Sequence, residues 1–240
     1  MERDLLLISN SKLYGSGYLD HCESQIVEIL GDRKEVLFVP FARPGGMTFD
    51  QYTHTARERF KRMGFNLRGI HESNNSYMEI QRAEAIFIGG GNTFLLLDQL
   101  YVRDLIADIF DKVLEGTPFI GSSAGSNVAG STIMTTNDMP IAYPRSFDAL
   151  GLVPFNINPH YLDPSPDSKH MGETREARIK EYHVFNDTTV VGLREGAMLR
   201  VRDNKVSLIG NAGARVFRKG QEPTEHLPGE SLDFLLEDSK

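Results

Sequence analysis

Short, unbroken apolar runs alternate with longer amphipathic stretches through the first half of the chain. An unbroken apolar run of strand length indicates a strand buried on both faces, and apolar positions at helical spacing indicate a covering helix. The predicted strands are Leu5–Ser9, Glu35–Pro40, Phe65–Ile70, Ala85–Ile88 and Pro118–Ser122, and the predicted helices are Tyr18–Leu30, Phe49–Met63, Thr93–Leu100 and Arg103–Leu114. This alternation predicts an α/β fold with a mostly parallel sheet flanked by helices.

The pattern changes after Gly130. Residues 135–166 are rich in Pro, Asn and Asp, which is typical of loops, and they surround a predicted strand at Leu152–Asn158. The remaining predictions are a helix at Glu173–Phe185, short strands at Thr189–Leu193, Ala197–Arg202, Val206–Ile209 and Arg215–Arg218, and a turn at Asp203-Asn204. No linker-like stretch divides the chain, so we expect one domain over residues 1–240 with extra C-terminal strands.

The segment Gly121-Ser122-Ser123-Ala124-Gly125 has the pattern G-x-S-x-G and lies between an apolar run and small residues suited to a helix start. This is the context of a nucleophile elbow, in which a serine sits on a tight strand-to-helix turn and flanking glycines remove clashing side chains. Ser123 is therefore the candidate nucleophile. The alternative is that Ser123 only occupies a tight turn, because such pentapeptides also occur by chance.

A serine hydroxyl needs a base, usually a histidine that a carboxylate holds in one tautomer. His160 is the candidate base because it follows an apolar run and because Pro159 restricts the backbone before it. His183 falls in a helical pattern, His226 in a polar tail and His170 in a loop. Taken alone, His160 is also compatible with a hydrogen-bonded structural histidine.

Glu195 is the candidate carboxylate, since it comes directly after the apolar run Thr189–Leu193. The resulting order Ser, His, Glu differs from the usual α/β-hydrolase order, in which the acid precedes the histidine. An oxyanion hole needs backbone N–H donors, for which we expect Ala124 after the serine and Gly91 in a glycine run after a predicted strand. The alternative for Glu195 is a solvated loop acid.

Composition narrows the classes of function. The chain is 40% hydrophobic and 25% charged, as globular proteins are, and its net charge of −7 argues against general nucleic-acid binding. No segment approaches membrane-spanning length, and one cysteine, Cys22, excludes an intrachain disulfide. We therefore expect a cytoplasmic protein without nucleic-acid or membrane partners. No metal-ligand spacing is present, so no metal or cofactor is expected.

The chain resembles the peptidase E, or α-aspartyl dipeptidase, family in segments that keep the family's order. Besides the elbow these are Gly89-Gly90-Gly91-Asn92, Thr136-Asn137-Asp138, Asn158-Pro159-His160, Gly172-Glu173-Thr174-Arg175 and Glu195-Gly196. The resemblance runs from the first strand to Glu195. It implies a flavodoxin-like fold of the class I glutamine amidotransferase group, a Ser123–His160–Glu195 triad, metal-free hydrolysis of dipeptides with N-terminal aspartate, and a monomer or homodimer.

This substrate class calls for particular side chains. A substrate β-carboxylate suits a guanidinium, for which Arg175 is the first candidate and Arg178, one turn along the same predicted helix, the second. Thr174 would add a hydroxyl, and Asp138 is the candidate partner of the free α-amine. The alternative for both arginines is the solvated face of a helix.

Other functions remain open from the sequence. An isoaspartyl or cyanophycin-type exopeptidase would use the same triad on β-linked aspartyl bonds. A general esterase would act on simple acyl esters. A non-catalytic binding protein on the same scaffold would keep its function without Ser123.

Overall fold

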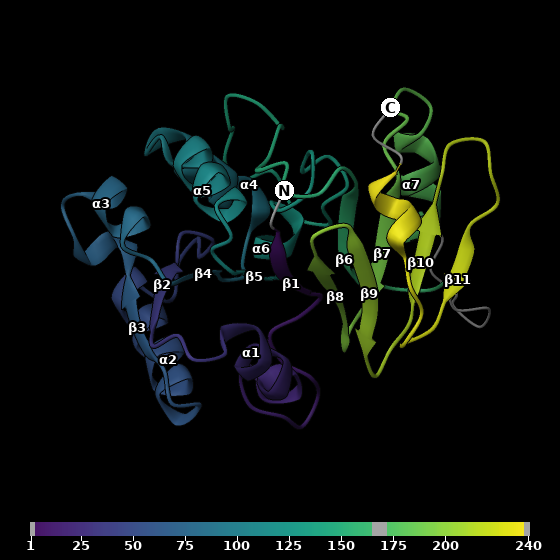
Figure 1. Ribbon diagram of the computed structural model, residues 1–240. Helices are drawn as coiled ribbons and strands as arrows, with labels where there is room; N and C mark the ends of the chain where they lie inside the picture. Colours follow the sequence, from purple (N-terminus) through teal and green to yellow (C-terminus); the bar gives the residue numbers. More distant parts are fainter. Residues whose placement is uncertain (1–2, 165–171, 238–240) are drawn as a thin grey trace.

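The computed structural model describes residues 3–164 and 172–237. Its larger sheet has seven strands in the order β3-β2-β4-β5-β1-β8-β9. The parallel strands are β1 (Asp4–Ile8), β2 (Glu35–Val39), β3 (Asn66–Gly69), β4 (Ala85–Ile88) and β5 (Phe119–Ser122). Beyond β1 the sheet continues with β8 (Ala197–Arg202) and β9 (Lys205–Gly210), which pair antiparallel (Figure 1). The predicted α/β class with a mostly parallel sheet is confirmed.

A second sheet of four strands follows the order β11-β10-β7-β6. Its strands are β6 (Asn156–Tyr161), β7 (Val190–Arg194), β10 (Ala214–Phe217) and β11 (Thr224–His226). Strands β6 and β7 run parallel, whereas β10 pairs antiparallel with both β7 and β11. Strands β7 and β8 belong to different sheets, yet only Glu195 and Gly196 separate them. This short connection therefore crosses from one sheet to the other.

Helices cover both faces of the larger sheet (Figure 1). On one face lie α1 (Glu23–Leu30) and α2 (Phe49–Arg62), and on the other lie α4 (Thr93–Val102), α5 (Leu105–Leu114) and the short α6 (Ala124–Asn127). Helix α3 (Ser76–Gln81) packs near α5, and α7 (Arg175–Tyr182) covers the second sheet. Short 3-10 turns occur at Asp20–Cys22, Ile70–Glu72 and Asp233–Leu236.

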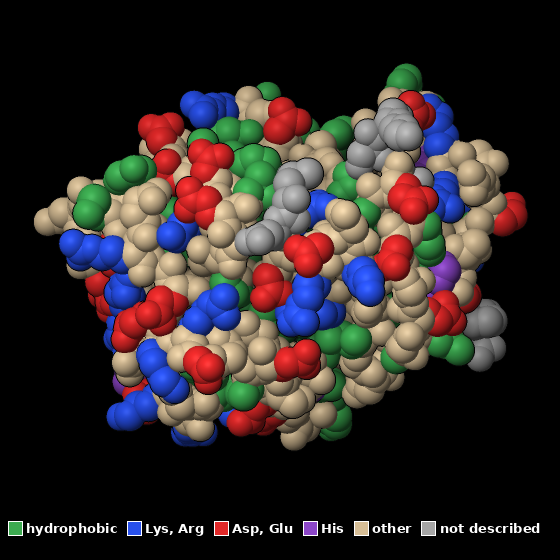
Figure 2. Space-filling view, in the orientation of Figure 1, with side chains coloured by type: hydrophobic (Ala, Val, Ile, Leu, Met, Phe, Trp, Pro, Cys, Tyr) green, Lys and Arg blue, Asp and Glu red, His purple; other side chains and the backbone are tan. Residues whose placement is uncertain are grey.

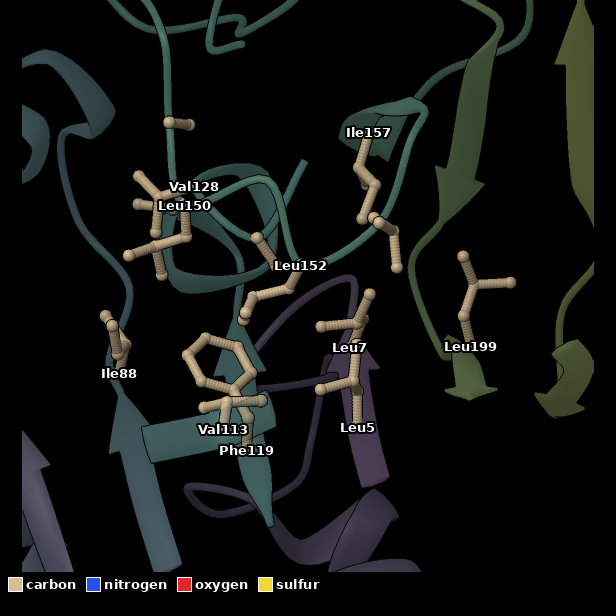
Figure 3. Packing of buried hydrophobic residues seen from close by; sticks show 14 of the residues in the cluster. Leu5, Leu7, Ile88, Val113, Phe119, Val128, Leu150, Leu152, Ile157 and Leu199 are labelled. Carbon is tan, nitrogen blue, oxygen red and sulfur yellow. The ribbon is translucent and has the colours of Figure 1, made fainter. Parts of the chain in front are cut away.

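Successive residues of β1 enter two hydrophobic clusters, one on each face of the larger sheet. Leu5 and Leu7 pack on the α4 and α5 side, and Leu6 and Ile8 pack on the α1 and α2 side, because neighbouring side chains of a strand point to opposite faces. Burial on both faces explains the unbroken apolar runs of the sequence. The first cluster also includes Ile157 of the second sheet (Figure 3), so the two sheets share one core.

The apolar run from Leu152 is only partly a strand. Strand β6 begins at Asn156, and Leu152 and Val153 are buried in the loop before it. The Val153 N–H donates to the Ala129 carbonyl at 3.2 Å, so the loop is bonded to the segment after α6 and not to a strand. Pro154 within the run has no N–H to give to a sheet. The predicted strand Leu152–Asn158 is therefore wrong in its first half, and the strand continues past its predicted end.

Helix ends differ from the predictions where residues adopt left-handed backbone. Leu19 has φ 59°, and a 3-10 turn follows it, so α1 begins at Glu23 and not at Tyr18. Asp104 has φ 54° and separates α4 from α5. Helix α7 ends at Tyr182, short of the predicted Phe185. The two-residue turn Asp203-Asn204 joins β8 to β9 as predicted, and α3 and β11 were not predicted at all.

Acidic and basic side chains are interspersed over the face shown in Figure 2. The net negative charge is therefore not gathered into one patch on this face. Among the described residues, no helix is both long and apolar enough to span a bilayer.

Candidate active site

Ser123 lies between β5 and α6 with φ 55° and ψ −111°, a backbone conformation that residues with a side chain rarely adopt. The two glycines of the motif make this turn possible. A Cβ on Gly121 would lie 2.6 Å from the Gly125 carbonyl oxygen, and one on Gly125 would lie 2.1 Å from the Ile88 carbonyl oxygen. The turn therefore presses against β4, and only glycine fits at both positions.

A continuous chain of contacts joins the side chains of Ser123, His160 and Glu195. Ser123 Oγ lies 3.0 Å from His160 Nε2, and His160 Nδ1 lies 2.7 Å from Glu195 Oε1. These distances suit one hydrogen bond on each ring nitrogen, so the carboxylate would favour the tautomer that leaves Nε2 to accept from the serine. The three residues come from β5, β6 and the β7–β8 connection, so the chain of contacts spans both sheets.

A bulge in β6 sets the direction of His160. The pairing register with β7 shifts between Pro159 and Tyr161, and His160 at the shift has φ 53°. Such an extra residue bends a strand and changes the aim of its side chain. Sequence analysis expected His160 after a strand, whereas the structure places it within one.

Residues directly after β1 hold the base and the acid in place. The His160 N–H donates to Ser9 Oγ at 2.9 Å, and Ser9 Oγ donates to the Leu193 carbonyl at 2.7 Å. The Gly196 N–H donates to Asn10 Oδ1 at 2.8 Å. Ser9 and Asn10 are fully buried. The end of β1 thus ties both β6 and the Glu195-Gly196 connection to the larger sheet.

The glycine run after β4 lies against the serine. A Cβ on Gly90 would come within 2.9 Å of Ser123 Cβ, and a Cβ on Gly91 would lie 2.1 Å from the Ala42 carbonyl oxygen. Tyr52 Oη donates to the Gly90 carbonyl at 3.2 Å. The run therefore needs glycine for close approach, and it borders the cavity beside Ser123.

These side chains open into a cavity of about 430 Å³. It is lined by Ser11, Arg43, Gly90, Gly91, Thr93, Ser123, Thr136, Asn137, Asp138, Pro159, His160 and Arg175. Arg175 and Asp138, two of the residues expected to bind substrate, are thus brought to the serine. Thr174 and Arg178 are not among the lining residues.

The four expected substrate-binding residues have distinct surroundings. Arg175 is half-buried. Burial lowers the pKa of its guanidinium, and the neighbouring charge of Arg178 lowers it further, whereas the charge of Asp138 opposes this shift. Arg178 is exposed and lies 3.8 Å from Glu173. Thr174 caps α7 by accepting from the Ala177 N–H at 3.1 Å, so its hydroxyl already has a structural partner.

Asp138 is held at the start of α4. Its Oδ2 accepts from the N–H and the hydroxyl of Thr93, both at 2.7 Å, and from the Thr136 hydroxyl at 3.3 Å. Asn137 donates to the Pro159 carbonyl at 2.8 Å, which joins the same loop to β6 beside His160. Asp138 therefore presents a carboxylate whose position is fixed from two sides.

Sequence analysis missed the residues that follow β1 and β2, namely Ser9, Asn10, Ser11 and Arg43. The carboxyl ends of neighbouring parallel strands meet at one edge of a sheet, which is where ligands bind in open α/β folds. The predicted strands ended at Ser9 and Pro40, so this rule pointed to the same residues. His170 lies outside the described residues.

Comparison with known proteins places the chain in a family. The profile of peptidase family S51 matches residues 5–209. The chain belongs to peptidase family S51. The resemblance inferred from the sequence is thereby confirmed, and so is the assignment to an enzyme family of serine-type hydrolases.

Relatives of this S51 chain match it over nearly their full length. A probable alpha-aspartyl dipeptidase of Drosophila melanogaster is 47% identical over 238 residues, which cover 98% of both chains. A peptidase E of Streptomyces coelicolor is 45% identical over 234 residues, covering 98% of this chain and 95% of its own. A peptidase E of a Nostoc species is 46% identical over 239 residues, covering 99% and 98%.

Solved structures share the S51 chain's fold at lower sequence identity. A peptidase from an acI-B1 actinobacterium has a TM-score of 0.73 and 20% identity, with 97% of each chain covered. A putative peptidase E from Listeria monocytogenes EGD-e has a TM-score of 0.68 and 20% identity, covering 88% of this chain and all of its own. At this identity the likeness concerns the fold alone.

Proposed function

We propose that this S51 chain is a serine dipeptidase that hydrolyses Asp-X dipeptides, releasing the residue after an N-terminal aspartate. The observation that carries the proposal is the Ser123–His160–Glu195 chain of contacts at the wall of a cavity that also holds Arg175 and Asp138. The names of the relatives, alpha-aspartyl dipeptidase and peptidase E, support the same activity.

The proposed reaction begins with attack of Ser123 Oγ on the peptide carbonyl carbon while His160 Nε2 takes the hydroxyl proton. The Gly91 and Ala124 N–H groups donate to the oxyanion of the tetrahedral intermediate. His160 then gives the proton to the leaving amine, and the C–N bond breaks to leave an aspartyl ester on Ser123. His160 then takes a proton from a water molecule, whose oxygen attacks the ester carbonyl carbon. When the bond from that carbon to Ser123 Oγ breaks, His160 gives this proton to the serine oxygen and aspartate is released. Glu195 keeps His160 in one tautomer throughout.

Substrate selection follows from the charges at one end of the cavity. A guanidinium binds a carboxylate with two parallel hydrogen bonds, so Arg175 takes the aspartate β-carboxylate. The carboxylate of Asp138, which Thr93 already orients, accepts hydrogen bonds from the α-ammonium group of the substrate. Arg178 is not among the residues that line the cavity, and the Thr174 hydroxyl caps α7, so neither has a direct role in this proposal.

The first test compares four substrates in the presence of EDTA: Asp-Leu, β-Asp-Leu, Leu-Leu and N-acetyl-Asp-Leu. We expect leucine release from Asp-Leu alone, and we expect Ser123→Ala to reduce kcat by about 10³-fold or more. Release from β-Asp-Leu instead would move the chain to the isoaspartyl exopeptidases. Hydrolysis of simple acyl esters only would favour the esterase, and no turnover at all would favour a binding protein.

The second test assigns the β-carboxylate site. Arg175→Met should lower kcat/KM for Asp-Leu by roughly 100-fold, because it removes a charge-assisted bidentate contact. The preference for Asp-Leu over Asn-Leu should fall with it. Arg178→Met, on the same helix but outside the cavity, is the matched control and should leave both values near those of the wild type. Equal losses in the two variants would contradict the role of Arg175.

A further inference from the structure

Arg43 is a cation of the cavity to which the proposed reaction gives no role. It follows β2 and lines the cavity together with Ser11 and the Gly90-Gly91 segment. Its guanidinium stacks on the Tyr52 ring, 4.5 Å from the ring centroid. Tyr52 in turn donates to the Gly90 carbonyl, so the position of Arg43 is tied to the glycine run beside Ser123.

Among residues 3–164 and 172–237, no side chain or backbone group accepts a hydrogen bond from the guanidinium of Arg43. It forms no ion pair with the part of the chain that the structure describes, and its Nε is buried with no hydrogen-bond partner there. By contrast, Arg194 stacks on Tyr161 and also pairs with Asp163 at 2.7 Å. A buried polar group without a partner is costly, so an unfilled guanidinium in a cavity indicates a place for a ligand acceptor. A planar carboxylate matches its geometry best.

Arg43 enters the cavity from the opposite side of the larger sheet to Asp138. Its stacking partner Tyr52 belongs to the hydrophobic cluster of α1 and α2. Asp138 is bonded to Thr93 of α4, a helix that packs in the cluster on the other face. Ser123 directly follows β5, which is a strand of the larger sheet. The cavity that Ser123 lines is thus bordered by a guanidinium stacked on Tyr52 of one helical layer and by a carboxylate bonded to Thr93 of the other.

A dipeptide also has charge on both sides of its scissile bond. The N-terminal aspartate carries an ammonium group and a β-carboxylate, and the leaving residue carries the terminal α-carboxylate. We propose that Arg43 binds this α-carboxylate and so selects dipeptides over longer peptides. The inference rests on the proposed function, because it takes the aspartate to lie toward Arg175.

The length selection follows from chain geometry. In a tripeptide the position next to Arg43 would hold a neutral peptide group, and the terminal carboxylate would lie about 3.3–3.6 Å farther along the chain. The charge-assisted hydrogen bonds would then be lost. A carboxamide at the end of the dipeptide produces the same loss without adding length, which makes it the cleaner probe.

The experiment compares hydrolysis of Asp-Leu and Asp-Leu amide by the wild type and by Arg43→Met. The wild type should favour the free acid in kcat/KM by roughly 10- to 100-fold, the range expected for a hydrogen bond to a charged group. Arg43→Met should lose this preference, because its kcat/KM for Asp-Leu should fall while its kcat/KM for Asp-Leu amide stays nearly unchanged. A wild type that treats both alike overturns the inference. Equal losses on both substrates do so too, since Arg43 would then act on the aspartate side.

Two further variants separate charge from structure. Arg43→Lys should restore part of the preference, since lysine keeps the charge but not the bidentate fork. Arg103→Met removes another stacked arginine, 4.6 Å from the Phe41 ring centroid and outside the cavity lining, and should leave the preference intact. A loss of preference in Arg103→Met as large as in Arg43→Met would assign the effect to packing and overturn the inference.

Binding to a non-reacting protein distinguishes this inference from the proposed function. In calorimetry with Ser123→Ala, Asp-Leu should bind at least about tenfold more tightly than its amide, and the double variant with Arg43→Met should lose that difference. Equal dissociation constants, or no detectable binding of either peptide, overturn the role of Arg43. Failure of the wild type to hydrolyse Asp-Leu would count against the proposed function alone.

Discussion

The two halves of the candidate site are positioned by different means. On the parallel half of the larger sheet, Ser123 sits on a tight turn that needs both flanking glycines, because a Cβ on either one would clash with backbone atoms. On the side of the second sheet, His160 and Glu195 depend on partners far away in sequence, namely Ser9 and Asn10. The difference is between local steric constraint and long-range hydrogen bonding.

This difference also decides what each half reveals in the sequence. A locally constrained turn appears as a short motif, so G-x-S-x-G points directly at Ser123. A residue held by distant partners has no such motif of its own, and His160 and Glu195 were selected by their places after apolar runs, by Pro159 before the histidine, and by the family resemblance. Changes at the two halves should therefore have different consequences, and the following predictions use that contrast.

The largest effect is expected for Gly125→Ala. The new Cβ would lie 2.1 Å from the Ile88 carbonyl oxygen, so the elbow or β4 must move. We expect a loss of about 3 kcal/mol or more in the free energy of unfolding, at the upper end for overpacking, together with loss of peptidase activity. Urea unfolding and Asp-Leu turnover measure the two effects.

Gly151→Ala provides the comparison for that variant. Gly151 has φ 65° but nothing within 4 Å of an added Cβ, so only backbone strain of about 1–2 kcal/mol is expected. Similar losses in both variants would show that the elbow is not specially constrained by contact with β4.

Ser9→Ala tests the long-range half and should have an intermediate effect. It removes the acceptor of the His160 N–H and the donor to Leu193, and we expect a loss of about 1–3 kcal/mol in the free energy of unfolding. Because the base would no longer be held in line with Ser123, kcat should fall by roughly 10- to 100-fold.

The readout that matters for Ser9→Ala is kcat at a temperature where the variant is fully folded. Ser131→Ala, which removes a weaker bond to the Val153 carbonyl at 3.4 Å outside the cavity, should leave kcat unchanged. A Ser9→Ala protein with lowered stability but normal kcat would show that β1 does not position the base.

The smallest effect concerns pH, and it draws on one histidine next to a helix of each sheet. Burial lowers the pKa of His21, next to α1, and of His183, at the end of α7, below the ordinary value of 6.5. As the pH falls below about 6.5, the unfolded chain takes up protons that the folded protein does not, so stability is lost progressively through the folded pKa values.

Urea unfolding between pH 8 and pH 5 measures this loss. His21→Gln and His183→Gln should each flatten the decline, whereas His54→Gln, at an exposed position of α2, should not. If only one of the two variants changes the slope, then one half of the molecule alone carries the acid sensitivity.

Much of the fold was predictable because parallel strands buried on both faces leave unbroken apolar runs. The errors have physical causes in particular segments. Leu152 and Val153 are as buried as any strand residue, yet they lie in a loop bonded to the segment after α6, and hydrophobic pattern alone does not distinguish the two. Strand β11 lies at a sheet edge with mostly exposed residues, so it leaves no apolar signal.

For the candidate site, the serine motif and the predicted strand ends indicated which side chains lie together in the cavity. They did not indicate the hydrogen bonds that position these side chains. Arg175 was the first candidate and Arg178, one turn along the same predicted helix, the second, and only the fold shows that Arg175 lines the cavity whereas Arg178 is exposed. The bulge at His160 and the role of Ser9 arise from pairing between two sheets. Sequence spacing carries no information on that pairing.

The Glu195-Gly196 connection limits how the length of this protein can vary. Surface loops commonly accept added residues at small cost. Here Glu195 contacts His160, and Gly196 has φ 86°, a left-handed conformation that favours glycine. An insertion would move a carboxylate and separate two sheets at once. Family members that gain or lose residues should therefore do so at other loops. The number of residues between β7 and β8 should stay constant in members whose site is active.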